Sequence, residues 1–174
     1  MVLAALGATL GSALDAIHTH FGATAYSRPV IWAMAWWVPP LFAGAFSVGL
    51  VRPLLGRTTG RRLGPPRTAT VLLAFVLFVA AYWVSVLPLA WPVVSALLLA
   101  IFAASWWCCD RSGLGLLVAV GAAIGGPLFE SAFVALGTFV HIRPAYLGVS
   151  GWLPFLYLSA AIALQCAARW LVEA

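Results

Sequence analysis

Charge is what this sequence has least of. Only 7% of its 174 residues are charged, against 64% that are hydrophobic, whereas soluble globular domains carry roughly 25% charged residues. Because so few polar side chains cannot cover a water-exposed surface, a soluble fold is excluded. Lysine is absent, and the net charge of +5 is the balance of nine arginines against four acidic residues. These arginines are not interleaved with aromatic residues on a soluble face, so we expect no nucleic-acid partner.

Cysteine is also sparse, and repetition is not evident. Cys108, Cys109 and Cys166 have neither disulfide nor metal-ligand spacing, and we interpret them as small apolar packing residues. We find no convincing internal repeat, which argues against a transporter built from repeated halves. No residue pattern indicates a cofactor, and we expect none.

Long apolar runs make up most of the chain. A membrane-spanning helix needs about 20 such residues, and the alternation typical of a membrane barrel is absent. The sequence therefore predicts an all-α integral membrane protein, a six-transmembrane-helix bundle that forms a single domain over residues 1–174. We interpret the first run as a retained helix rather than a signal peptide, because no basic residue precedes it. The expected helices cover residues 2–20, 30–51, 68–87, 90–109, 114–139 and 150–172.

Residues 52–67 form the main polar break between these runs. Gly and Pro interrupt this arginine-rich segment, so we expect a loop, and positive loops remain on the cytoplasmic side of a membrane. Both termini are then cytoplasmic, and only Arg28 and Arg143 lie outside. We also expect the inner arginines to contact anionic membrane lipids. The inner set is Arg52, Arg57, Arg61, Arg62, Arg67, Arg111 and Arg169.

Two consecutive prolines interrupt the second predicted helix, in the stretch Trp36-Trp37-Val38-Pro39-Pro40. Each proline removes a backbone donor and disturbs the preceding turn. We expect a bend there that helps to open a cavity toward the lipid, and we take Trp36, Trp37, Pro39 and Pro40 as candidate lipid-binding residues. The alternative is a plain kink, with both tryptophans in the aromatic belt at the membrane surface.

A second tryptophan pair ends the fourth predicted helix, in the stretch WWCCDRSG at residues 106–113. Asp110 and Arg111 are expected in a tight turn at the cytoplasmic face. One interpretation is that Asp110 only caps the fifth helix through its free N–H groups. The other is that Asp110 and Arg111 form a surface that binds a membrane partner.

These two stretches, together with Ser150, Trp152, Leu153 and Pro154 at the start of the last helix, resemble the Insig (insulin-induced gene) family in order and spacing. The resemblance implies a regulator that is not an enzyme. It implies that the helix bundle binds a sterol or another neutral lipid such as diacylglycerol, and that the protein holds a polytopic membrane partner. The expected location is the bacterial cell membrane, or the endoplasmic reticulum membrane in a eukaryote.

Four ionisable residues are expected near the outer ends of the helices. Asp15 and His18 share one face of the first helix, Glu130 lies in the fifth helix, and His141 follows it. Ionisable groups within a span are costly and usually pair or line a cavity. Either these residues pair with one another, or Asp15, His18 and Glu130 bind the hydroxyl of a neutral lipid at the mouth of a cavity.

Two other functional classes are weighed against the lipid binder. A metal-dependent enzyme would use Asp15, His18, Glu130 and His141 with His20 as ligands, but His18 and His20 point to different helix faces. A small transporter would need a charged path through the middle of the bundle, where the sequence places no charge. We therefore expect no metal and no catalytic residue.

Small residues provide two possible helix-packing faces. Gly7 with Gly11, and Gly121 with Gly125, have the Gly-x-x-x-Gly spacing that lets membrane helices approach closely. The spacing serves either packing within the bundle or formation of a homo-oligomer, and the sequence leaves both open.

Overall fold

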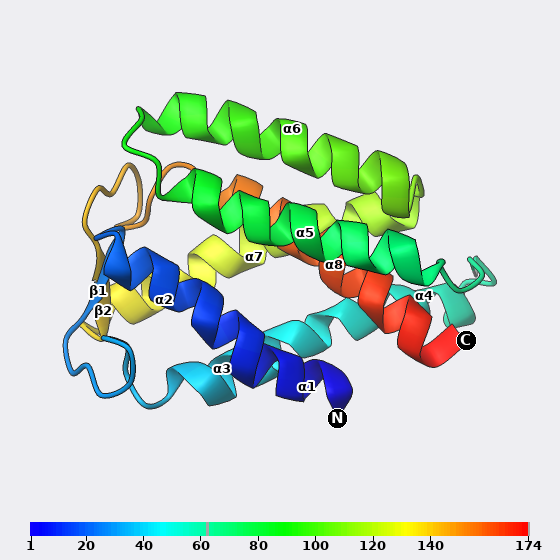
Figure 1. The fold of residues 1–174 in the computed structure, drawn as a ribbon, viewed down its shortest axis with the longest axis horizontal. Helices are drawn as coiled ribbons and strands as arrows, with labels where there is room; N and C mark the ends of the chain where they lie inside the picture. The colour runs from blue at the N-terminus through cyan, green and yellow to red at the C-terminus, as the bar shows by residue number, and fades with distance from the viewer. Residues whose placement is uncertain (62, 174) are drawn as a thin grey trace.

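The computed structural model describes residues 1–61 and 63–173. Within this part of the chain, six helical spans are long and apolar enough to cross a membrane, which confirms the six-helix membrane bundle (Figure 1). The first two spans change helix type along their length. The first contains α1 (Val2–Leu6), the π-helical turn η1 (Gly7–Gly11) and α2 (Ser12–His20), and the second contains α3 (Val38–Ser47), the 3₁₀ turn η2 (Val48–Leu50) and α4 (Val51–Thr58).

The other four spans are continuous α-helices: α5 (Thr68–Ser85), α6 (Trp91–Cys109), α7 (Gly113–Ala135) and α8 (Leu153–Glu173). Two short strands, β1 (Thr24–Tyr26) and β2 (Phe139–His141), pair at the end of the bundle opposite the C-terminus (Figure 1). Helix α8 is the most buried span and packs against α5, α6 and α7. The apolar core therefore surrounds α8, which contributes buried residues such as Leu156, Ile162 and Ala168.

The two glycine pairs have different roles in the bundle. Added Cβ atoms would collide with the backbone of Phe42 at Gly7 and with its ring at Gly11. This pair lets the first span approach α3 closely. Added Cβ atoms at Gly121 and Gly125 would meet no atom within 4 Å, so this second pair is not a packing face within the bundle.

The prediction that Pro39 and Pro40 bend the second helix is wrong. The second span begins at Val38, so both prolines lie in the first turn of α3, with Trp37 as the N-cap. Proline is well tolerated there, because the first helical N–H groups lack intrahelical partners and the fixed φ suits a helix start. The preceding residue, Trp36, lies outside the helix and is 68% exposed.

The expected loop over residues 52–67 is also corrected at its start. The second span continues through α4 to Thr58, so Arg52 and Arg57 are helical. Arg52 is almost fully buried because it forms an ion pair inside the protein. The remaining arginine-rich segment connects α4 to α5, and Arg62 lies outside the described residues.

The expectation of no internal repeat is overturned by the backbone. The order of secondary structure from α2 through β1 to α3, a helix, a short strand and a helix, is the same as the order from α7 through β2 to α8. Gly22 and Gly137, which are 115 positions apart, follow α2 and α7 with the same φ of +69°. At this separation Arg28-Pro29 matches Arg143-Pro144, and the positive φ angles at positions 32 and 33 recur at positions 147 and 148.

The two copies meet in a reciprocal manner at the strand pair. The antiparallel strands β1 and β2 pair about their middle residues. The Ser27 N–H donates to the Thr138 carbonyl at 3.1 Å, and the equivalent Ile142 N–H donates to the Ala23 carbonyl at 3.0 Å. Such reciprocal contacts are the signature of a two-fold axis between two equivalent segments.

This axis runs along the membrane normal, because both copies cross the membrane in the same direction. The arrangement is a parallel repeat, in which the first half contains the spans Val2–His20 and Val38–Thr58, and the second half contains α7 and α8. The α5–α6 hairpin is inserted between the halves and has no counterpart. The sequence conceals the repeat because few residues are identical in both copies.

Candidate functional site

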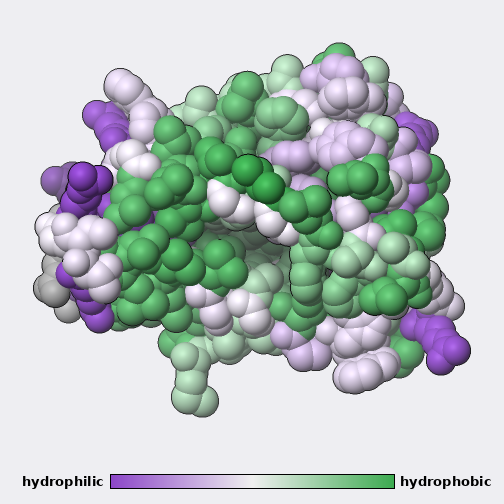
Figure 2. Space-filling view, turned by 180° about the vertical axis from the view of Figure 1, so that it is seen from behind, coloured by the Kyte–Doolittle hydropathy of each residue, from purple (hydrophilic) through white to green (hydrophobic). Residues whose placement is uncertain are grey.

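A cavity of about 710 Å³ lies between the two halves. Its volume falls within the range of roughly 300–1,000 Å³ that is usual for small-molecule sites. Its wall consists mainly of apolar residues from α3, η2, α7 and α8, and Gly44, Gly121 and Gly125 leave open space along it. A space-filling view shows a hollow in the hydrophobic middle of the molecule, between two more hydrophilic ends (Figure 2).

The first half contributes the carboxyl of Asp15 to this cavity. The Tyr26 hydroxyl donates a hydrogen bond of 2.7 Å to Asp15 Oδ2. Burial raises the pKa of the Tyr26 phenol well above its usual value, so this hydroxyl remains a proton donor. Asp15 Oδ1 lies 3.9 Å from His18 Nδ1, which is too long for a hydrogen bond. The other ring nitrogen, His18 Nε2, lies 2.8 Å from Ser85 Oγ.

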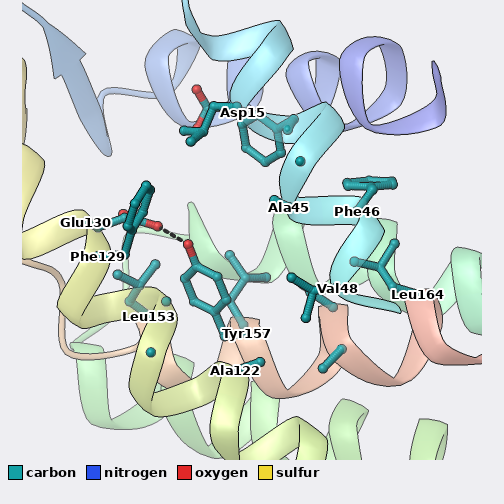
Figure 3. A pocket seen from close by; sticks show the side chains of 18 of the residues that line it. Asp15, Ala45, Phe46, Val48, Ala122, Phe129, Glu130, Leu153, Tyr157 and Leu164 are labelled. Atoms are coloured by element: carbon teal, nitrogen blue, oxygen red, sulfur yellow. Dashed lines mark hydrogen bonds between the residues drawn. The ribbon is translucent and has the colours of Figure 1, made fainter. Parts of the chain in front are cut away.

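The second half contributes the carboxyl of Glu130, which faces the cavity from α7 (Figure 3). The Tyr157 hydroxyl donates to Glu130 Oε1 at 2.6 Å, and His141 Nε2 lies 2.9 Å from Glu130 Oε2. His141 Nδ1 in turn contacts Ser150 Oγ at 3.1 Å. Both oxygens of Glu130 therefore have a protein partner.

The predicted lipid-binding residues divide into two groups in the structure. Asp15, His18, Glu130 and Trp37 all line the cavity, and the first three lie toward the ends of α2 and α7 that lead into β1 and β2. Trp36, Pro39 and Pro40 are not among the lining residues. They lie at or before the start of α3 because the helix begins later than expected.

Tyr26 and Tyr157 are site residues that the sequence analysis missed. Each donates a hydrogen bond to a cavity carboxyl. A tyrosine in a largely apolar membrane sequence is a weak signal, because tyrosine is also common at membrane surfaces. Recognition of the repeat would have found Tyr26, since it occupies the position equivalent to His141.

The predicted partner-binding residue Asp110 lies at the opposite end of the bundle, which the sequence predicts to be cytoplasmic. Its side chain is 2% exposed, and Asp110 Oδ2 lies 3.6 Å from both Arg52 Nε and Arg169 Nη1. It does not cap α7 as one interpretation proposed. The cap is Ser112, whose Oγ accepts from the Gly115 N–H, while Asp110 Oδ1 accepts from the Ser112 N–H.

Arg111 is exposed next to this buried cluster. It has a φ of +54°, donates from Nε to the Trp107 carbonyl, and its guanidinium lies 4.2 Å from the centre of the Trp107 ring. Trp107 itself is 59% exposed. The surface available at this end is therefore formed by Arg111 and Trp107, with Asp110 beneath it.

The candidate metal ligands do not form one group. Among the residues the structure describes, no cluster of three or more His, Cys, Asp or Glu side chains could hold a metal ion. Asp15 and Glu130 are bonded to different partners, and His20 packs edge-on against Phe21.

These features define a class: a multi-pass α-helical membrane protein with a mainly apolar cavity between two related halves and with ionisable groups toward one end. No protein-family model matches the chain. The insulin-induced gene 1 protein of Xenopus tropicalis is 30% identical over 173 residues, which cover 93% of this chain and 67% of the relative. The human insulin-induced gene 1 protein is 29% identical, with coverages of 93% and 61%.

A solved structure agrees with these relatives. The mycobacterial Insig homologue MvINS from Mycobacterium vanbaalenii is 27% identical to this chain and has a TM-score of 0.84, over 99% of this chain and 93% of MvINS. A cross-linked trimer of an MvINS cysteine variant matches equally well. The chain belongs to the Insig family, and it is a multi-pass integral membrane protein.

Proposed function

We propose that this protein binds a neutral lipid, a sterol or a diacylglycerol, in the cavity and acts as a regulator rather than as an enzyme. The observation that carries the proposal is the cavity of about 710 Å³, whose wall is mainly apolar and whose ionisable groups Asp15, His18 and Glu130 lie toward one end. An amphiphile with a long hydrophobic body and a small polar head has the same distribution. A large charged head group would place its charges in this apolar space at high cost.

Bound lipid would act by favouring one arrangement of the two halves. The cavity wall includes α3 from the first half and α7 and α8 from the second, so one ligand contacts both. A ligand shifts a conformational equilibrium only by its difference in affinity for the two states. A ligand that fills the space between the halves meets this requirement if the space changes when they move.

The partner of this regulator is a polytopic membrane protein, in keeping with the membership of the Insig family. We place the contact at Arg111 and Trp107 on the cytoplasmic side, where both side chains are exposed. Asp110 supports this surface from below through Arg52 and Arg169. The trimer of MvINS supports the expectation that this chain also forms a homo-oligomer, and the expected location is a bacterial cell membrane.

Transport is the second candidate function, and the internal repeat favours it. Parallel repeats related by an axis along the membrane normal occur in several transporter folds, and the absence of a repeat was one argument against transport. Flux of a labelled solute into proteoliposomes separates the two functions. A lipid binder gives no flux above that of empty liposomes.

The lipid-binding proposal is tested by native mass spectrometry of gently extracted protein, with identification of the co-purified lipid. We expect a stoichiometric neutral lipid that added sterol or diacylglycerol displaces. Gly121→Leu and Gly125→Leu place side chains into the open space of the cavity wall and should lower lipid retention about tenfold, because they occupy volume that the ligand needs.

The matched control is Gly113→Leu, at the start of the same helix, where an added Cβ also meets no atom within 4 Å but which does not line the cavity. This variant should retain lipid as the unaltered protein does. Recovery of bulk phospholipid alone, unchanged by the two cavity variants, would reject the proposal.

A further inference from the structure

The two cavity carboxyls occupy equivalent positions in the internal repeat. Asp15 and Glu130 are 115 positions apart, the separation that relates the two halves. Each carboxyl contacts a donor eleven residues later in the chain, Tyr26 for Asp15 at 2.7 Å and His141 for Glu130 at 2.9 Å. The two halves therefore build the same carboxyl–donor pair from different residues.

The second hydrogen bond of each carboxyl differs between the halves. In the second half, Tyr157 supplies a hydroxyl to Glu130 Oε1 (Figure 3). The equivalent residue in the first half is Phe42, which has no hydroxyl. The equivalence extends to packing, because an added Cβ at Gly126 would collide with the Tyr157 ring, and one at Gly11 would collide with the Phe42 ring.

Asp15 Oδ1 consequently has no hydrogen-bond partner among residues 1–61 and 63–173. The neighbouring nitrogen, His18 Nδ1, cannot supply one. The Ser85 hydroxyl donates its only proton to the Tyr82 carbonyl at 2.7 Å, so the contact between His18 and Ser85 uses the proton on His18 Nε2. In a neutral imidazole Nδ1 is then an acceptor. Two acceptors thus lie 3.9 Å apart at the cavity with no donor between them.

We propose, building on the lipid-binding function above, that Asp15 Oδ1 with His18 Nδ1 is the head-group site, and that it accepts a hydrogen bond from the hydroxyl of an uncharged lipid. The lipid hydroxyl takes the place of the hydroxyl that Phe42 lacks. Aspartate is one methylene shorter than glutamate, which leaves more room for the incoming group. A carboxylate or phosphate head group offers acceptors only and is repelled at this position.

The probes are two pairs of lipids, dioleoylglycerol with its acetyl ester and cholesterol with cholesteryl acetate. Each ester keeps the body of the lipid but lacks the donor hydroxyl, and the two pairs separate a glyceride source from a sterol source. Binding to delipidated protein is measured by native mass spectrometry. We expect one alcohol to bind about tenfold more tightly than its ester, as a hydrogen bond to a carboxyl group implies.

Exchange of the two aromatic residues tests which carboxyl accepts the lipid. Phe42→Tyr supplies the missing hydroxyl to Asp15 and should abolish the preference for the alcohol. Combining Phe42→Tyr with Tyr157→Phe frees Glu130 Oε1 and should restore the preference. Phe75→Tyr adds the same hydroxyl outside the cavity and should change nothing, which separates the proposed effect from a general effect of an added hydroxyl.

The possible failures are distinguishable. Equal binding of alcohol and ester would overturn the head-group site and leave lipid binding standing, whereas no binding of any probe would overturn the proposed function as well. A preference that persists in Phe42→Tyr would exclude Asp15 as the acceptor. If Phe42→Tyr elutes as an aggregate, Asp15→Leu replaces it, and loss of the preference is again the expected result.

Discussion

At the outer end of the bundle, the first half holds Asp15 with Tyr26, and the second half holds Glu130 with His141. The two pairs have the same spacing and the same position around the two-fold axis. They differ in the residues that form them, and Glu130 has a second donor, the hydroxyl of Tyr157, where the first half has Phe42. The two halves therefore share a symmetric framework at this end, and the proposed head-group site rests on the asymmetry within it.

The opposite end of the two halves, which is predicted to be cytoplasmic, is not symmetric. Arg52 of the first half has Ala167 at the equivalent position, and Arg169 of the second half has Leu54. Both arginines contact Asp110, which comes from the turn between the inserted hairpin and α7. The inner end is therefore joined by an ion cluster of Arg52, Asp110 and Arg169, to which Glu173 adds a contact of 3.7 Å with Arg169, and the repeat alone could not form it.

The largest expected effect is on this inner cluster. Asp110→Ala would leave two buried arginines without their shared counter-charge, so the free energy of unfolding should fall by about 3–5 kcal/mol. Denaturant unfolding in detergent measures this change. Arg111→Ala is the control at the neighbouring exposed position and should change stability little. A neutral result for Asp110→Ala would mean that the cluster does not join the halves.

An intermediate effect is expected where the repeat predicts equal behaviour. Gly11→Ala and Gly126→Ala both push a methyl group into an aromatic ring of the same half, and each should cost about 1–3 kcal/mol of unfolding free energy. Gly44→Ala and Gly121→Ala face open space and should be neutral or slightly stabilising, since alanine favours helices. Thermal unfolding of the four variants measures the contrast. A cost at one of the first two positions only would break the proposed equivalence.

The smallest expected effect is the difference in stability cost between the variants at the two carboxyls. Tyr26→Phe removes the one side-chain hydrogen bond that Asp15 makes within the described part of the chain and should cost about 1–3 kcal/mol. Tyr157→Phe should cost less, because Glu130 keeps His141 as a partner. The two unfolding free energies are compared in delipidated protein, so that bound lipid does not compensate. Equal costs would show that the contact of Glu130 with His141 does not stabilise the protein.

The six spans and the Insig family could be predicted from the sequence. Apolar runs of this length have few alternatives in a membrane, and the three tryptophan-containing stretches keep their order and spacing. The position of Asp15, His18 and Glu130 at one end of the cavity also followed from the helix directions. Each of these predictions rests on a pattern along the chain.

The other features depend on contacts between distant residues. Whether Pro39 bends a helix or begins one depends on where the first helical turn forms, which the loop before it decides. Asp110 was expected in a turn, but its burial requires Arg52 and Arg169 from two other helices. The repeat is conserved in backbone conformation more than in residue identity, so it becomes evident only from the φ angles and the reciprocal strand contacts.

The most direct test of lipid binding is a crystal structure of the protein with its co-purified lipid retained. We predict electron density for a hydrophobic body between the two halves, with a hydroxyl oxygen within hydrogen-bond distance of Asp15 Oδ1. Density for detergent alone, or for a phosphate head group at the end of the cavity that holds Asp15 and Glu130, would contradict this prediction.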